Sequence, residues 1–103
     1  MIETSQKTFL TSTNHYMKTI YKYPVTVGID CTYQMPEGVE PLYFGIDGKQ
    51  ELCLWALIDT KGPLVSMVFF VVSTGDEVPD DKVWYRGTCV QGRFVWHLFQ
   101  RSR

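Results

Sequence analysis

Residues 84–100 read WYRGTCVQGRFVWHLFQ, and this stretch decides the fold class. Its two halves are rich in aromatic and β-branched residues, and the central Gln91-Gly92 supplies turn residues typical of a tight hairpin. The second half is apolar at both sets of alternating positions, so it has no polar face. The sequence therefore predicts two antiparallel strands at residues 84–91 and 93–100.

Short apolar runs separated by turn residues continue back along the chain. Residues 51–58 and 64–72 are apolar at nearly every position, and a Gly-Pro pair separates them. Their length and β-branched content favour strands over helices. Residues 39–46 lead through Asp47-Gly48, a strong hairpin signal, into the run at 51–58. We therefore expect these two strands to be antiparallel neighbours.

Alternation of apolar and polar residues predicts two further strands near the beginning of the chain. Residues 17–23 alternate lysines with threonine and tyrosine, and residues 27–33 alternate apolar with small or polar side chains up to a turn-prone segment at 35–38. In the strand at 39–46, the same alternation places Leu42 on one face with Phe44.

The fold class follows from the number and spacing of these strands. No segment shows a long 3.6-residue period and no internal repeat is visible. About seven strands joined by short turns predict an all-β protein, either a compact antiparallel sandwich or a small barrel. Residues 17–103 are expected to form a single β domain, preceded by a flexible N-terminal arm or upstream extension at residues 1–16.

Composition limits the classes of partner. The chain has 45% hydrophobic residues and a formal net charge of −1, which is typical of a globular protein and disfavours binding to duplex nucleic acid. It has no run of about 20 apolar residues and no secretory signal pattern, so we expect a cytoplasmic protein without membrane contact. Three cysteines, an odd number with no close pair, suit a reducing compartment.

The sequence carries none of the common catalytic motifs. It has no Gly-rich phosphate loop, no nucleophile elbow, no paired-cysteine zinc spacing and no zinc-binding His-Glu helix. We therefore expect no enzyme activity, no cofactor and no metal. Four carboxylates at residues 76–81 could hold a hard cation, but a solvated loop explains them better. A small phosphodiesterase that uses His97 and this acidic loop is a further alternative.

The strongest candidate site groups aromatic and cationic residues of the C-terminal hairpin. Aromatic rings can stack on a base while cationic groups meet phosphate, which is what a nucleotide pocket needs. Aromatic pairs across strands also stabilise ordinary sheets, and a half-buried histidine can simply hydrogen-bond across a sheet. The candidate ligand contacts are Trp55, Tyr85, Arg86, Trp96 and His97.

Three predicted strands are apolar on both faces, namely those at 51–58, 64–72 and 93–100. Without a helix to cover the second face of a sheet, such a surface usually marks an interface. The sequence therefore predicts a homo-oligomer.

The chain resembles a family of small uncharacterised proteins encoded mainly by tailed bacteriophages and prophages. The resemblance covers residues 17–100, with its motifs in the same order. They are MKTIYKY at 17–23, MPxG at 35–38, CLWALID at 53–59, TG at 74–75, YxGT at 85–88 and FVWHLF at 94–99.

The resemblance implies a context rather than an activity. Short accessory proteins of phages often interfere with host defences in the cytoplasm of the host cell. Combined with the candidate site, it leads us to expect a protein that binds and sequesters a small signalling nucleotide without turnover. The alternative is a protein-binding inhibitor that docks on a host defence protein, because protein interfaces also favour Trp, Tyr and Arg.

Overall fold

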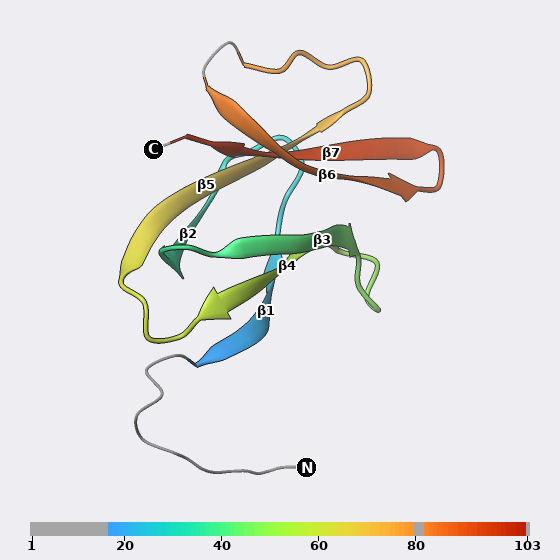
Figure 1. The fold of residues 1–103 in the computed structure, drawn as a ribbon. Helices are drawn as coiled ribbons and strands as arrows, with labels where there is room; N and C mark the ends of the chain where they lie inside the picture. Colours follow the sequence, from blue (N-terminus) through green and yellow to red (C-terminus); the bar gives the residue numbers. More distant parts are fainter. Residues whose placement is uncertain (1–16, 80–81, 103) are drawn as a thin grey trace.

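The computed structural model of the protein describes residues 17–79 and 82–102, and this part of the chain is built from strands and connecting turns. The residues for which an N-terminal arm is expected, 1–16, lie outside the described residues. No helix capable of spanning a membrane occurs within the described ranges. The seven strands (Figure 1) are β1 (Lys18–Pro24), β2 (Cys31–Pro36), β3 (Glu40–Ile46), β4 (Leu52–Asp59), β5 (Leu64–Ser73), β6 (Val83–Gln91) and β7 (Phe94–Arg101).

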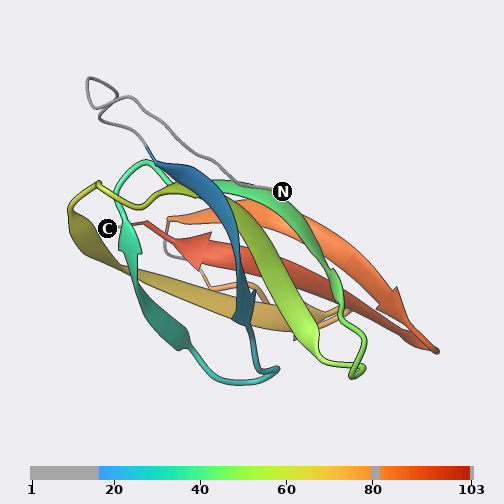
Figure 2. The ribbon, with the colours of Figure 1, turned by 90° about the horizontal axis from the view of Figure 1, so that it is seen from below.

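The strands form two antiparallel sheets that pack face to face. One sheet has three strands in the order β1-β4-β3, and the other has four in the order β2-β5-β7-β6. Seen from below, the three-stranded sheet lies in front of the four-stranded one (Figure 2). Neither sheet closes on itself, so the molecule is a sandwich and not a barrel. The predicted all-β antiparallel fold of about seven strands is confirmed.

The core lies between the sheets and is made by the inward side chains of the central strands. In β4 the inward positions include Leu54 and Ala56, and in β5 they include Phe69, all of them fully buried. Leu98 of β7 completes this layer with no exposed surface. These strands are apolar at nearly every position, and the structure shows which of their two faces packs into the core.

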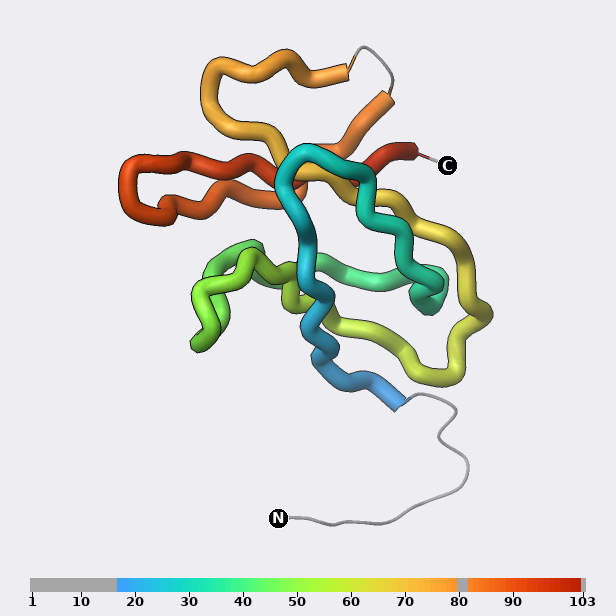
Figure 3. Tube along the Cα trace, turned by 180° about the vertical axis from the view of Figure 1, so that it is seen from behind, coloured from blue at the N-terminus to red at the C-terminus, as the bar shows by residue number. Residues whose placement is uncertain are grey.

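Both predicted hairpins are confirmed. Strands β3 and β4 pair antiparallel around the Asp47-Gly48 turn, and β6 and β7 pair around a turn that brings Gln91 opposite Phe94. The tip of the β6–β7 hairpin extends beyond the β3–β4 turn in all three views of the chain (Figure 3).

The strand predicted at residues 27–33 is wrong in its position. Strand β2 begins only at Cys31 and ends at Pro36. Gly28 has a φ of +88°, which interrupts an extended chain, and the apolar residues on either side of it are exposed. The turn after β2 falls at Gly38, whose φ is +84°. The alternation before Cys31 therefore belongs to a loop.

The prediction that Leu42 shares a face with Phe44 is wrong because β3 contains a β-bulge. The register shifts between Pro41 and Tyr43, so the intervening residue is not paired. Leu42 is consequently 46% exposed, whereas Phe44 is buried in the core. A single extra residue reverses the alternation on one side of a bulge, which the residue pattern alone does not reveal.

A second bulge lies in β6 between Tyr85 and Gly87, at the point where the β6–β7 hairpin contacts β3 of the other sheet. Gly87 has a φ of +155°, and a Cβ atom placed on it would lie 3.0 Å from the Cβ of Phe44 in β3. The absence of a side chain at Gly87 therefore permits close approach of β6 to β3.

Substitution Gly87→Ala is expected to destabilise the fold by about 1–3 kcal/mol, because the added methyl group must push β6 away from Phe44. Urea unfolding followed by tryptophan fluorescence measures this change. Gly48→Ala is the matched control, since its Cβ would meet nothing within 4 Å. Equal stabilities for the two variants would show that the contact at Gly87 does not limit the packing of the sheets.

Candidate functional site

The structure places the five predicted ligand contacts at three different locations. Tyr85 and His97 lie on the outer face of the four-stranded sheet. Tyr85 of β6 is paired with Phe99 of β7, and His97 of β7 is paired with Thr88 of β6. Trp96, next in sequence to His97, points the opposite way, toward the other sheet.

Arg86 lies in the β6 bulge and also turns toward the inner side, where its Nε donates to the buried Gln100. Trp55 is on the outer face of the three-stranded sheet, beside Tyr43. The five side chains therefore do not surround a common space within one copy of the chain.

His97 is held by hydroxyl groups on both sides of its ring. Its Nε2 lies 2.8 Å from Oγ1 of Thr74, and its Nδ1 lies 3.0 Å from Oγ1 of Thr88. The Tyr85 hydroxyl in turn hydrogen-bonds to Thr88. A neutral imidazole has one donor and one acceptor nitrogen, and hydroxyls satisfy either. Neither nitrogen of His97 is thus free for a phosphate, which favours the interpretation of a histidine hydrogen-bonded across the sheet.

Trp96 and Arg86 are engaged with their neighbours. The Trp96 ring stacks on Phe94 at 5.0 Å between centroids, and its Nε1 donates to Oε1 of Gln91 at 3.0 Å. The Arg86 guanidinium lies 5.2 Å from the centre of the Trp84 ring. Partial burial lowers the pKa of Arg86 from its ordinary value, but an arginine remains charged.

An aromatic cluster occupies the middle of the outer face of the four-stranded sheet. Phe70 of β5 stacks against Phe99 of β7, and Tyr85 meets Phe99 edge to face. Arg101 crosses above Phe70 at 4.7 Å and pairs with Asp30 at 3.1 Å. Phe70 is consequently buried although it faces outward.

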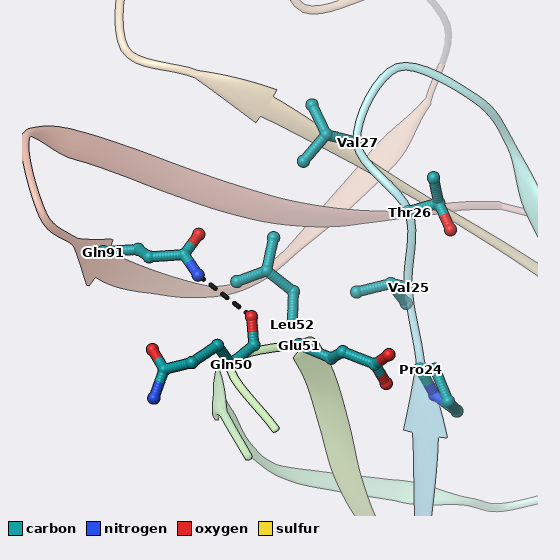
Figure 4. A pocket seen from close by; sticks show the side chains of 8 residues that line it. All are labelled: Pro24, Val25, Thr26, Val27, Gln50, Glu51, Leu52 and Gln91. Atoms are coloured by element: carbon teal, nitrogen blue, oxygen red, sulfur yellow. Dashed lines mark hydrogen bonds between the residues drawn. The ribbon is translucent and has the colours of Figure 1, made fainter. Parts of the chain in front are cut away.

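Two shallow hollows occur on the described surface, and neither is lined by a predicted contact. The larger, of about 350 Å³, lies at the end of the sandwich, where Gln91 Nε2 donates to the Gln50 carbonyl at 3.1 Å (Figure 4). The smaller, of about 220 Å³, lies beside Phe70 and includes Asp30 and Glu77. The larger hollow contains Glu51 and no cationic side chain, and in the smaller one Arg101 is already paired with Asp30, so both disfavour a phosphate group.

Instead, the β6–β7 hairpin exposes large apolar side chains on both faces. Tyr85 and Val90 are 58% and 67% exposed on the outer face, and Trp84 and Phe94 are 46% and 51% exposed on the other. The sequence analysis did not single out Val90 or Phe94. Their exposure depends on β6 being an edge strand and on the hairpin extending past its neighbours, which the residue pattern does not specify.

Asp76, in the acidic loop after β5, has a structural role. Its carboxylate accepts hydrogen bonds from the Ser73 amide and hydroxyl, and these bonds hold the pKa of Asp76 below its usual value. Residues 80 and 81 lie outside the described residues. Within the described ranges, no group of three or more His, Cys, Asp or Glu side chains is placed to hold a metal ion.

Asp47 connects the β3–β4 turn to β1 through a group of polar contacts, which we call the Lys22–Asp47 clamp. Its carboxylate accepts hydrogen bonds from the Lys49 and Glu51 amides at 2.8 and 2.9 Å, and Nζ of Lys22 lies 3.0 Å away. These donors hold the pKa of Asp47 well below its usual range. Beneath the clamp, the Cys53 thiol is fully buried, and burial raises its pKa.

Fold and surface together define a class of protein: a small antiparallel β-sandwich from which an aromatic-rich hairpin projects. The chain belongs to the family described as a domain of unknown function, DUF7352, whose profile matches residues 17–103. Comparison with curated proteins and with solved structures found no match.

Substitution Asp47→Asn is expected to remove part of the acid sensitivity of the fold. Because the pKa of Asp47 is lowered by folding, its carboxylate stabilises the protein above the unfolded value of about 3.9, and this stabilisation is lost as the pH falls below it. Between about pH 6 and pH 3, the wild-type thermal midpoint should therefore fall further than that of the variant. Parallel pH profiles for the two proteins would contradict this assignment.

Proposed function

We propose that this protein acts by binding a partner protein, and that the β6–β7 hairpin forms the contact surface. The observation that carries the proposal is the exposure of four large apolar side chains on this one hairpin: Trp84, Tyr85, Val90 and Phe94. Tyr and Trp with neighbouring Arg are the residue types enriched in the centres of protein interfaces. A small ligand would instead need an enclosing pocket around the same residues.

The hairpin is also well suited to binding because it is held rigidly. Gly87 seats it against Phe44, and the Gln91 side chain joins its tip to the β3–β4 turn. Cross-strand contacts between the Tyr85, Thr88 and His97 side chains fix its outer face. A surface ordered before binding loses less conformational entropy on association, so more of the contact free energy contributes to affinity.

The resemblance to phage and prophage proteins suggests the class of partner. We infer that the partner is a host defence protein and that binding takes place in the cytoplasm of the host cell. Inhibition of this kind requires occlusion of the partner and needs no catalytic residue, which agrees with the absence of common catalytic motifs in the sequence.

A photo-crosslinking amino acid at Val90 should give one discrete adduct when the full chain is produced in bacteria that carry phage-defence systems. The same amino acid at Gln34, exposed on β2 away from the hairpin, is the control and should not give this adduct. Tyr85→Ala should reduce the yield at Val90 several-fold, since large interface aromatics contribute strongly to affinity. Identical adducts at both positions, or none, would contradict the proposal.

Sequestration of a signalling nucleotide is the second proposal. The exposed ring of Tyr85 lies beside the hydroxyl group of Thr88, and a base stacked on the ring could hydrogen-bond to it. In a single copy this surface is open, so tight retention of a nucleotide would require a second chain to close over it.

Native mass spectrometry and calorimetry with cyclic mono- and dinucleotides test the second proposal. Tyr85→Ala should weaken binding about tenfold or more, because base stacking on an aromatic ring contributes about 1–3 kcal/mol. Trp55→Ala should leave it unchanged, since Trp55 lies on the opposite sheet. Absence of binding at millimolar nucleotide, or equal loss in both variants, would rule out this site.

A further inference from the structure

The larger hollow, at the end of the sandwich, is built from three segments that are distant in sequence. Its walls are the loop after β1, the β3–β4 turn with the start of β4, and the tip of the β6–β7 hairpin. The buried side chains of Val25 and Leu52 form its apolar part, together with the partly exposed Val27 (Figure 4). The Val25 amide donates to the Leu52 carbonyl at 3.0 Å, and Gln91 bonds to the Gln50 carbonyl. Hydrogen bonds therefore join the walls to each other.

The hydrogen-bond donors on these walls are largely used within the chain. Nε2 of Gln91 donates to the Gln50 carbonyl, while Oε1 of the same side chain accepts from Nε1 of Trp96 at 3.0 Å. The Thr26 amide donates to the Cys31 sulfur at 3.2 Å. A ligand rich in hydrogen-bond acceptors would therefore find few donors in this hollow.

Glu51 carries the charge of the hollow, and no other residue that lines it is charged. The ion pairs of the described residues do not include Glu51. The pKa of Lys22 is raised mainly by its hydrogen bond to Asp47, and Glu51 adds least to this shift. Lys49 and Arg93, in the two turns beside the hollow, do not line it. An apolar wall thus lies next to a carboxylate that no lining residue neutralises.

The turn before Glu51 fixes the position of its backbone. The Glu51 amide donates to Oδ1 of Asp47 at 2.9 Å, and its carbonyl accepts from the Asp47 amide at 2.9 Å. Gln50 has a φ of +66°, a left-handed conformation that favours glycine. Strain of this kind is concentrated at binding sites. Because the backbone is ordered beforehand, less entropy is lost when a ligand binds to the Glu51 side chain.

We propose that this hollow binds the guanidinium group of an arginine side chain. A guanidinium group is a cation with N–H donors only, and the Glu51 carboxylate accepts from them. The aliphatic stem of the arginine contacts Val25, Val27 and Leu52. Guanidinium is more weakly hydrated than ammonium, so its partial burial costs less than that of a lysine. A single side chain is expected to bind with a dissociation constant of about 1 mM.

The hollow adjoins the proposed contact surface of the hairpin. Gln91, on its wall, is paired with Phe94, which is 51% exposed. A protein bound to the hairpin can therefore place an arginine in the hollow. A free alkylguanidine offers the same chemistry, so the binding site itself does not depend on the proposed function.

The probe is N-acetyl-arginine N-methylamide, titrated into the full chain up to about 50 mM and followed by amide chemical shifts in NMR spectra. The amides of Val25, Val27 and Leu52 should shift saturably. The citrulline analogue replaces the guanidinium with a neutral urea group of the same shape. It should bind about tenfold more weakly, because it forms no charge-assisted hydrogen bond. Absence of saturable shifts, or equal affinity for the two probes, would overturn the proposal.

Glu51→Gln removes the charge of the hollow and keeps the size of the side chain. It should weaken binding of the arginine probe about tenfold and leave binding of the citrulline probe unchanged. Glu40→Gln is the matched control, since it makes the same change on β3 outside the hollow. It should bind both probes as the wild type does. The NMR spectra also report whether each variant is folded, and an equal loss in both variants would contradict the site.

Photo-crosslinking from Val90 distinguishes the two sources of the guanidinium group. A several-fold lower adduct yield with Glu51→Gln supports an arginine of the bound protein as the ligand. An unchanged yield, together with lost binding of the arginine probe, supports a free alkylguanidine instead. Absence of any adduct from the wild-type chain would contradict the proposed function alone, since the titration uses no partner protein.

Discussion

The contact between Gly87 and Phe44 is the constraint on which the arrangement of the two sheets depends. It lies where an edge strand of one sheet crosses an edge strand of the other, and a side chain at position 87 would crowd Phe44 there. Because the bulge that contains Gly87 also turns Arg86 toward the buried Gln100, one irregularity fixes the inner side of β6 and leaves the outer side free. The presentation of the hairpin is thus a direct result of how the sandwich closes.

Local features of the fold were predictable because local residues determine them. Asp47-Gly48 and Gln91-Gly92 marked both hairpins, and the two-sided apolar runs marked the central strands β4, β5 and β7. Long-range features were not. The order of strands in each sheet depends on contacts between distant segments, and a positive φ at Gly28 turned an alternating segment into a loop. The bulge that exposes Leu42 has no signature in the residue pattern.

The candidate site shows the same limit more strongly. The predicted pairing of the two strands of the C-terminal hairpin is confirmed, but adjacent residues of a strand point to opposite faces, which separates Trp96 from His97. Assignment of Trp55 to one sheet or the other required the topology itself. The sequence therefore identified residue types suited to binding, while their division among an outer face, a core-facing side and a second sheet became apparent only from the structure.

The Lys22–Asp47 clamp has a chemical consequence for the thiol beneath it. Oxidants and alkylating agents react with thiolates, and Cys53 is buried, has a raised pKa and donates toward Asp47. Its thiol is therefore kept protonated and out of reach of sulfenic acid formation. Cys89 is also buried with a raised pKa, and Cys31 is half-buried. The two buried thiols, those of Cys53 and Cys89, thus act as packing groups that are poorly accessible to oxidants and alkylating agents.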